Sequence, residues 1–235
     1  MKKKLALILA GTAMAAMVLA GCGDKNNASG EDVKTAESVE DKKTFTVGFD
    51  AEYPPYGYMD ENGEYTGFDL ELAEAVCKLE GWELVKKPLN WDSKDMELNS
   101  GSIDCIWNGF TMNGREDDYT FSTPYVDNSQ VIVVAEKSGI DTLEDLAGKT
   151  VGVQAASAAL DLLQSEEEGG QKKLADTFGA LNEFADYNTA FTELQAGALD
   201  ALAIDVGVAN YQIKSRGEGY KLSLIHISEP TRRVV

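Results

Sequence analysis

Short blocks of apolar and polar residues alternate along the central part of the chain, and the period of the pattern changes from block to block. Thr44–Phe49 is rich in β-branched and aromatic residues, as expected of a strand. Phe68–Glu80 repeats its apolar residues at helical spacing, and Gly81 stands just past its end. This alternation of strands and helices favours an α/β fold with a mostly parallel sheet.

The same pattern continues to residue 214. The predicted strands are Thr44–Phe49, Trp82–Lys87, Ile103–Trp107, Gln130–Glu136, Lys149–Val153, Leu181–Phe184 and Ala198–Ala203. The predicted helices are Phe68–Glu80, Thr142–Leu146, Ser157–Glu167, Thr189–Ala196 and Val206–Lys214. The stripe expected to face the core in the first of these helices consists of Leu72, Ala73, Val76 and Leu79.

Charge and composition narrow the classes of function. The chain has 235 residues, 40 acidic against 21 basic, and a formal net charge of −19. This length suits one large domain or two small lobes, and the shortage of Lys and Arg argues against nucleic acid and against a polybasic membrane surface. One His and three Cys do not supply the ligands of a structural zinc site, so no metal is expected. No cofactor is expected either. Cys77 and Cys105 are predicted to be core thiols, with a disulfide between them as the alternative.

The N-terminus has the pattern of an export signal. Three lysines precede an apolar run over residues 5–19, which is too short and too rich in small residues for a typical membrane-spanning helix. The run ends in Leu-Ala-Gly followed by Cys22, which resembles the bacterial lipobox, in which the cysteine is lipidated. The alternative is a plain secretory signal with a chance cysteine. We expect residues 1–21 to be a signal peptide and residues 22–43, which are mostly polar, to be a flexible tether.

The C-terminal segment has an unusual sequence. Residues 222–232 read Leu-Ser-Leu-Ile-His-Ile-Ser-Glu-Pro-Thr-Arg. This run resembles the in-frame translation of a transposase sequencing-library adapter, whose mosaic end begins CTG TCT CTT ATA CAC ATC. We therefore expect residues 222–235 to be a non-native tail and the native sequence to stop near Lys221. The alternative is a genuine β-strand.

Several short motifs follow one another in a fixed order between residues 44 and 221. They are Gly48–Tyr56, Gly63–Leu70, Ser100–Asp104, Trp107–Thr111 with Arg115, Tyr119–Tyr125, Leu146–Val153, and Leu194–Ala201 with Asp205. Each motif alone is weak, but the ordered set resembles the polar amino acid-binding proteins of bacterial ABC importers, solute-binding protein family 3.

The resemblance implies the periplasmic binding protein type II fold, in which two α/β lobes close on a ligand in the manner of a Venus flytrap. Residues 44–130 match the first part of lobe 1, and residues 131–221 match lobe 2. The first crossing between the lobes is expected near Gln130–Val134. In the family a second crossing and the segment that completes lobe 1 come later, so lobe 1 is expected to be incomplete at the C-terminus.

The resemblance also implies how the two charges of an amino acid are held. Arg115 matches the family's carboxylate clamp, because its planar fork can donate two parallel hydrogen bonds. The spacing between Thr111 and Arg115 is one residue shorter than is common in the family, and the alternative is a surface arginine paired with Glu116 or Asp117. Asp205 matches the acceptor for the ammonium, and an N-cap for the following helix is its alternative or additional role.

The remaining expected ligand contacts come from both lobes. Asn108, Gly109 and Thr111 match the stretch of lobe 1 that offers backbone and hydroxyl hydrogen bonds. Ser157 matches a helix N-terminus in lobe 2, where free N–H groups suit a carboxylate, and a simple N-cap is its alternative. The expected aromatic walls are Tyr53, Tyr56 and Trp107, with Phe110 as a further wall or a core residue. The nearby carboxylates of Asp50 and Glu52 favour a ligand with a cationic side chain.

By this resemblance the protein captures and delivers a ligand rather than catalysing a reaction. We expect a monomeric extracytoplasmic lipoprotein, anchored in the cell membrane through Cys22, that hands a polar amino acid to a membrane ABC permease. Two alternatives stay open, a ligand-sensing ectodomain and an enzyme such as a dehydratase, because fold alone does not fix function. Against an enzyme, residues 44–221 hold no histidine for acid–base work and no recognisable nucleophile motif.

Overall fold

Residues 43–217, 219–226 and 231–233 are described by the computed structural model, with side chains described as far as Leu222. The predicted signal peptide, Cys22 and nearly all of the predicted tether lie outside these ranges. Within the described ranges, no helix combines the length and the apolar character needed to cross a membrane.

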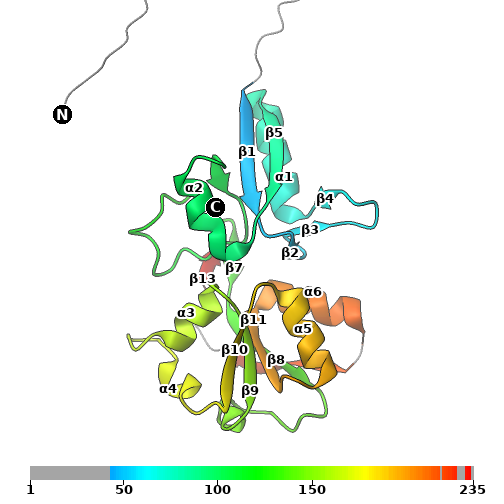
Figure 1. Cartoon of the computed structure of the whole chain (residues 1–235), viewed down its shortest axis with the longest axis vertical. Helices are drawn as coiled ribbons and strands as arrows, with labels where there is room; N and C mark the ends of the chain where they lie inside the picture. The colour runs from blue at the N-terminus through cyan, green and yellow to red at the C-terminus, as the bar shows by residue number, and fades with distance from the viewer. Residues whose placement is uncertain (1–42, 218, 227–230, 234–235) are drawn as a thin grey trace, which may run out of the picture. The chain divides into compact units, whose positions relative to one another are not determined.

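Lobe 1 is built on three parallel strands in the order β5-β1-β6. Figure 1 labels β1 and β5 of this sheet beside helix α1. Helix α1 packs its buried residues Leu70 and Ala73 against Val47 and Phe49 of β1. Cys77 is buried and Cys105 half-buried, and both thiols are unbonded. The elements of this lobe are β1 (Thr44–Phe49), β2 (Glu52–Tyr53), β3 (Gly57–Met59), β4 (Tyr65–Thr66), α1 (Phe68–Glu80), β5 (Glu83–Pro88), η1 (Trp91–Ser93), α2 (Lys94–Asn99) and β6 (Cys105–Ile106).

Lobe 2 contains a five-stranded sheet in the order β10-β9-β11-β8-β12. Strands β9, β10 and β11 are parallel, whereas β8 runs antiparallel to both β11 and β12. Its elements are β8 (Gln130–Ala135), η2 (Leu143–Leu146), β9 (Thr150–Gln154), α3 (Ala158–Gln164), α4 (Lys172–Ala175), β10 (Ala180–Phe184), α5 (Tyr187–Ala196), β11 (Ala201–Asp205), α6 (Val206–Arg216) and β12 (Tyr220–His226).

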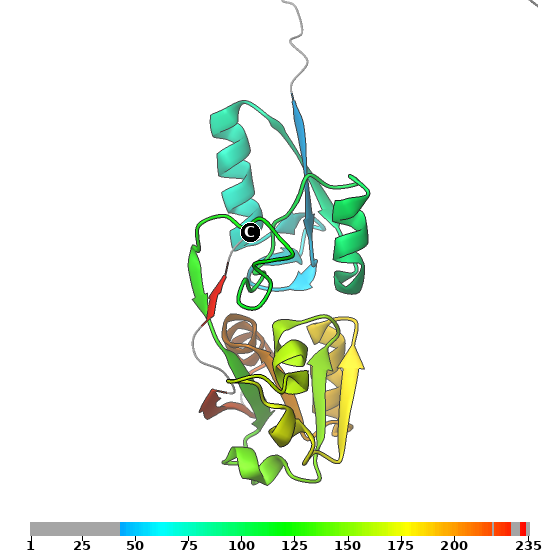
Figure 2. The same ribbon diagram turned by 90° about the vertical axis from the view of Figure 1, so that its left-hand side faces the viewer.

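Both faces of this sheet are covered, which explains the continuous apolar runs of its central strands. Successive side chains of a strand point to opposite faces. Leu202 and Ile204 therefore join a buried cluster with helices α5 and α6, while Ala201 and Ala203 join a second cluster with α3 and η2. Strand β8 divides its residues between the same two clusters, and Figure 2 shows helices on both sides of the sheet.

The chain passes from lobe 1 to lobe 2 through β7 (Val126–Asn128), which is followed after one residue by β8. Strand β13 (Thr231–Arg233) pairs with β7, and β12 pairs with β8. Strand β12 runs across position 222, where the adapter-like sequence begins. Strand pairing does not report where a sequence comes from, so the non-native origin of residues 222–235 stays a prediction.

Several expected element boundaries are corrected by the structure. The strand expected over Ile103–Trp107 is confined to β6, and the helix expected over Ser157–Glu167 ends at Gln164. The strand expected over Ala198–Ala203 lies at Ala201–Asp205, which puts Asp205 at its carboxyl end.

The buried face of α1 also differs from the expected stripe. Leu79 is 84 % exposed, and the residues that face the core are Asp69, Leu70, Ala73 and Cys77. The hydroxyl of Tyr125 donates a 2.6 Å hydrogen bond to the Asp69 carboxylate, so a polar group takes a buried position that a hydrophobic pattern does not predict.

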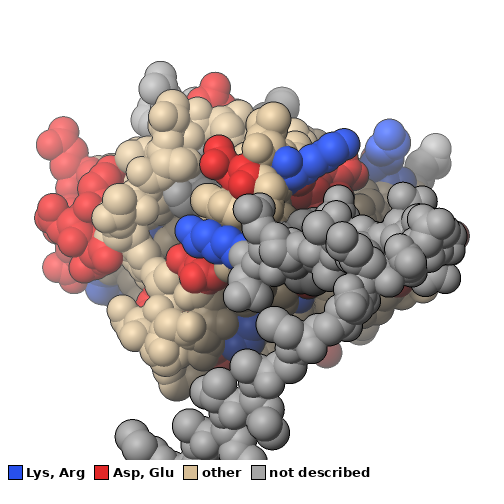
Figure 3. Space-filling view, turned by 90° about the horizontal axis from the view of Figure 1, so that it is seen from above, with Lys and Arg blue, Asp and Glu red and all other residues tan. Residues whose placement is uncertain are grey.

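The excess of acidic residues is visible on the surface. Figure 3 shows Asp and Glu side chains gathered along one edge of the face it presents, while Lys and Arg are scattered across it.

Candidate functional site

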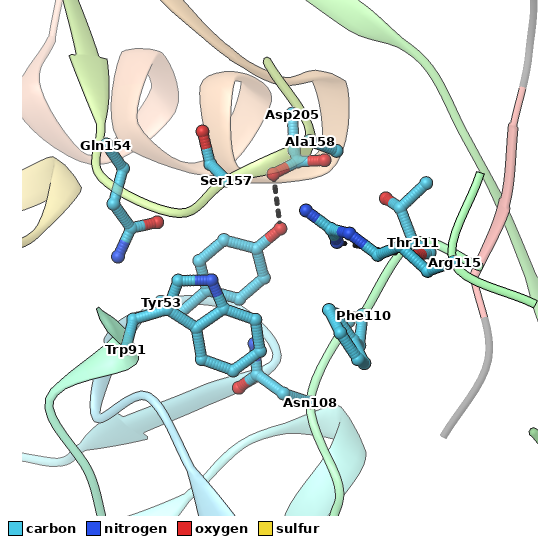
Figure 4. Close-up of a pocket in the computed structure, with 11 residues that line it drawn as sticks. Tyr53, Trp91, Asn108, Phe110, Thr111, Arg115, Gln154, Ser157, Ala158 and Asp205 are labelled. Atoms are coloured by element: carbon cyan, nitrogen blue, oxygen red, sulfur yellow. Dashed lines mark hydrogen bonds between the residues drawn. The ribbon is translucent and has the colours of Figure 1, made fainter. Parts of the chain in front are cut away.

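A small pocket lies between the two lobes, with side chains from both in its lining (Figure 4). The cavity has a volume of about 10 Å³, which is room for about one water molecule. Most of the polar lining residues stand at or beyond the carboxyl ends of parallel strands, the edge at which ligands bind in open α/β sheets. The lining residues are Tyr53, Trp91, Asn108, Gly109, Phe110, Thr111, Arg115, Gln154, Ser157, Ala158 and Asp205.

Asp205 provides the acidic side of the pocket. Its carboxylate accepts hydrogen bonds from the Tyr53 hydroxyl at 2.5 Å, from Gln130 Nε2 at 2.7 Å and from Asn128 Nδ2. Asp205 also occupies the N-cap position of α6, but its side chain makes no capping hydrogen bond there. The carboxylate is thus directed into the space between the lobes rather than at its own helix.

Arg115 provides the basic side. Its Nη2 forms a 2.5 Å ion pair with Asp161 of lobe 2, and its Nη1 donates to the Thr111 carbonyl oxygen at 3.3 Å. The guanidinium carbon lies 4.8 Å from the centre of the Phe110 ring. Glu116 and Asp117 were the alternative ion-pair partners expected for Arg115, and the structure pairs Arg115 with Asp161 instead. Because a guanidinium has five N–H donors, hydrogen atoms remain for a further carboxylate.

Asp50 is a buried carboxylate beside the pocket. It accepts a 2.7 Å hydrogen bond from Gln154 Nε2 across the lobes and a 2.8 Å bond from the Glu52 backbone N–H. Burial raises the pKa of Asp50 to about 6, against the lowering effect of these two hydrogen bonds. The backbone N–H of Asp50 donates to Asn108 Oδ1 at 3.1 Å, which fixes the orientation of that amide in the pocket lining.

Aromatic rings form much of the wall of the pocket. Trp91 and Phe110 pack edge to face at 5.4 Å, and Tyr53 lines the pocket with them. Tyr56 lies 5.7 Å from Tyr53, and both rings pack against the core cluster of lobe 2 that contains α5 and α6. Trp107 packs instead against the core of lobe 1.

Ser157 begins α3 as its N-cap. Its hydroxyl oxygen accepts a 3.2 Å hydrogen bond from the Leu160 N–H, so the capping role is present together with the position in the pocket lining. The preceding residue, Ala156, has φ of 53°, a left-handed conformation that is strained for a residue with a side chain. This turn brings the Ala156 carbonyl oxygen to 3.5 Å from Arg115 Nη2.

The structure brings together most of the site residues expected from the sequence. Asp50 and Tyr56 lie behind the lining, and Trp107 lies in the lobe 1 core. Trp91 and Gln154 were not expected, although each follows or ends a parallel strand and that position is a usable signal. Expected residues found in the lining are Tyr53, Asn108, Gly109, Thr111, Arg115, Ser157 and Asp205.

The sequence matches a family of known proteins. The family described as bacterial extracellular solute-binding proteins, family 3, matches residues 45–205. The L-cystine-binding protein TcyJ of Escherichia coli (strain K12) is 32 % identical over 195 residues, which cover 82 % of this chain and 69 % of that protein. The arginine-binding extracellular protein ArtP of Bacillus subtilis (strain 168) is 32 % identical over 220 residues, covering 93 % of this chain and 78 % of ArtP.

A solved structure agrees with the fold. It is an ABC uptake transporter substrate-binding protein from Streptococcus pneumoniae with bound histidine, and it is 33 % identical in sequence. The TM-score is 0.75, with 81 % of this chain and 78 % of that chain covered. The two-lobe type II periplasmic binding protein fold expected from the sequence is confirmed.

Proposed function

Since this chain belongs to the bacterial extracellular solute-binding proteins, family 3, we propose that it captures one free polar amino acid in the pocket between its lobes. The observation that carries the proposal is the meeting of Arg115 from lobe 1 and Asp205 from lobe 2 in one pocket lining. A free amino acid carries a carboxylate and an ammonium group, and both must be paired when they leave water. Arg115 supplies the cation for the carboxylate and Asp205 the anion for the ammonium.

Binding requires the lobes to move. A cavity with room for about one water molecule does not admit an amino acid while the lobes stay in contact. Asn128 and Gln130, which stand on the segment that joins the lobes, donate hydrogen bonds to Asp205. We place the hinge at this segment, directly beside the ammonium acceptor. The ligand then favours the closed arrangement, because only that arrangement offers the contacts of both lobes.

A cationic side chain is the substrate class that the pocket favours. The buried Asp50 carboxylate is hydrogen-bonded to Gln154, a residue of the pocket lining, and both of its hydrogen bonds come from neutral donors. A cation that replaced Gln154 at this carboxylate would relieve the cost of burying its charge. The arginine-binding and histidine-bound relatives support this class, and the cystine-binding relative supports cystine as a second candidate.

Delivery follows from the same assignment. We propose that a lipid on Cys22 anchors the protein on the extracytoplasmic face of the membrane and that the closed form docks on an ABC permease. Family membership supports an extracytoplasmic binding protein, and the relatives described above are themselves named as binding proteins. The sensor and dehydratase alternatives therefore become outcomes of the test below.

The test is a binding panel on the full chain. L-Arginine, L-lysine, L-histidine, L-cystine, L-glutamine and L-glutamate are added separately, and the melting temperature is measured, followed by calorimetry for any ligand that raises it. We expect stabilisation by the cationic amino acids and an affinity loss of about a hundredfold in Arg115→Ala and in Asp205→Ala, because each leaves one buried ligand charge unpaired.

Variants of the same residue types outside the pocket lining serve as controls. Arg216→Ala and Asp176→Asn remove charges outside the pocket lining and should bind as the unaltered protein does. A folded protein that none of the six amino acids stabilises would refute the amino acid assignment and favour the sensor or the enzyme. Stabilisation by L-cystine alone would keep the proposed function and replace the substrate class.

A further inference from the structure

Lys94 is a buried cation next to the pocket that the proposed function does not yet use. It is the first residue of α2, and only 5 % of its surface is exposed. Its Nζ lies 5.3 Å from the centre of the Trp91 ring and 5.8 Å from the centre of the Phe110 ring. Both rings line the pocket, so the ammonium is separated from the pocket by the thickness of its aromatic wall.

The position is unfavourable for a lysine because the ammonium is buried. Burial removes water from the ammonium, which lowers the pKa of Lys94. The Asp95 carboxylate lies 3.8 Å from the Lys94 ammonium, which is long for an ion pair, and the Tyr119 hydroxyl donates to the same carboxylate. The attraction of the Trp91 and Phe110 rings for the ammonium offsets part of the cost of burying it. A buried charge with only this compensation often marks a functional position.

Lys94 and Arg115 share one aromatic ring. The Arg115 guanidinium lies 4.8 Å from the centre of the Phe110 ring, and the Lys94 ammonium lies 5.8 Å from the same point. The negative charges that act on Lys94 are those of Asp95, Asp161 and Asp92, while the charge of Arg115 opposes it. Asp161 is already the ion-pair partner of Arg115. Two cations thus converge on the end of the pocket that we assign to the ligand carboxylate.

We propose that Lys94 is a positioning residue for the ligand carboxylate, acting through the Trp91 and Phe110 wall as a second positive charge behind Arg115. The inference rests on the proposed function, because it assumes that the ligand carboxylate binds at Arg115. A carboxylate bound there sits in the field of both cations, and that field is strong because the wall excludes water. Lys94 touches no ligand in this arrangement.

The test separates the charge of Lys94 from its packing. Lys94→Met keeps the length and apolar stem of the side chain and removes the ammonium, and Lys94→Arg keeps the charge. Affinities of the full chain are measured for L-arginine, L-histidine and L-cystine, each against its carboxamide, which lacks the carboxylate. For the amino acid that binds, we expect Lys94→Met to weaken affinity about five- to tenfold, as a charge acting at several ångströms would. The carboxamide should lose almost nothing, and Lys94→Arg should restore most of the affinity.

The melting temperature of the protein without ligand supplies the second readout. An apolar residue in this buried position should keep or raise it, since a buried ammonium is costly. Unchanged affinity in Lys94→Met would overturn the inference, as would an equal loss for the amino acid and its carboxamide together with a lower melting temperature. If neither Lys94→Met nor Lys94→Gln folded, the role of Lys94 would be in folding, and this result would overturn the inference as well. If the unaltered protein bound no amino acid, the proposed function itself would fail, and the two failures are thereby distinguished.

Discussion

The hydroxyl of Tyr53 in lobe 1 donates a 2.5 Å hydrogen bond to the carboxylate of Asp205 in lobe 2. The same carboxylate is the proposed acceptor for the ligand ammonium. Contact between the lobes and recognition of the ligand therefore meet at one group, which also receives hydrogen bonds from the hinge residues Asn128 and Gln130. We expect the hydrogen bonds of this carboxylate to differ between open and closed lobes.

Replacing Tyr53 by phenylalanine tests this coupling. Tyr53→Phe keeps the ring in the pocket wall and removes only the hydrogen bond to Asp205. We expect amino acid affinity to fall about tenfold, because a hydrogen bond to a charged group that is made in the closed form is lost. Calorimetry measures the change. Tyr58→Phe is the matched control, because its ring packs at a tilt against Tyr211, outside the pocket lining. Tighter binding in Tyr53→Phe would instead mean that the hydroxyl competes with the ligand for Asp205.

Replacing Arg115 by lysine tests the shape of the carboxylate clamp rather than its charge. A lysine keeps the positive charge but presents a point charge instead of a planar fork. We expect Arg115→Lys to weaken amino acid binding by about thirtyfold, because a bidentate pair becomes a single hydrogen bond. The free energy of unfolding should change little, since the ion pair with Asp161 has a partner that is 58 % exposed and contributes little to stability. Equal affinity in Arg115→Lys would argue against a bidentate clamp.

Gly207 lies where the first turn of α6 meets lobe 1. A Cβ added to Gly207 would stand 2.1 Å from the hydroxyl oxygen of Tyr56. We expect Gly207→Ala to weaken ligand binding about tenfold, because the lobes or the Tyr56 ring must shift to remove the overlap. Stability of lobe 2 should not fall, since alanine favours the helix over glycine.

The rescue experiment for this contact removes the clashing oxygen. Tyr56→Phe combined with Gly207→Ala should recover part of the lost affinity, because the ring carbons Cζ and Cε2 of residue 56 would still lie 2.9 Å and 3.0 Å from the added Cβ. Tyr56→Phe alone is measured as the reference for the double variant. Absence of rescue in the double variant, measured by calorimetry, would show that the overlap is not what limits closure.

The raised pKa of Asp50 predicts a pH dependence of stability. The pKa is 3.8 in an unperturbed aspartate and about 6 in the folded protein, so the folded state holds a proton that the unfolded chain has already lost. Stability from this group is complete below pH 3.8 and is lost as the pH rises through 6. The total is about 3 kcal/mol, at about 1.4 kcal/mol per pKa unit.

Asp50→Asn removes the titration and isolates this effect. The free energy of unfolding in urea is measured for both proteins at about pH 4 and about pH 7, on either side of the shifted titration. We expect the free energy of unfolding of the unaltered protein, relative to that of Asp50→Asn, to be lower at the higher pH than at the lower pH. If the difference in the free energy of unfolding between the two proteins did not vary with pH, it would contradict a raised pKa of the buried Asp50 carboxylate.

Much of the fold could be predicted from local sequence. Strong β-branched runs marked β1, β8 and β9, and helical spacing with a following glycine marked α1. Most site residues were found through ordered motifs, whose polar residues stand at strand ends. Boundaries were less certain, because the shift of β11 to end at Asp205 depends on pairing with β8 and β9 rather than on its own residues.

Other residues of the site, and some of the core, could be identified only from the tertiary structure. Trp91 and Gln154 join the pocket because the two lobes approach each other, and no sequence spacing relates residues from different lobes. Asp69 replaces an apolar residue on the buried face of α1 because Tyr125, distant in sequence, donates to it. Trp107, like Trp91, is a tryptophan of lobe 1 near the end of a strand, and its sequence position does not distinguish it from a pocket residue. It packs against the core of lobe 1 instead.

The sequence by itself determined the alternation of strands and helices, the family, and the choice of Arg115 and Asp205 as the charged candidates of the site. These depend on residue type and local spacing. The tertiary structure alone decided which donors hold Asp205, which carboxylate pairs with Arg115 and where the ammonium of Lys94 lies. Those contacts join residues from separate elements, and several join separate lobes. Their geometry is set by packing across the whole chain, which local patterns do not encode.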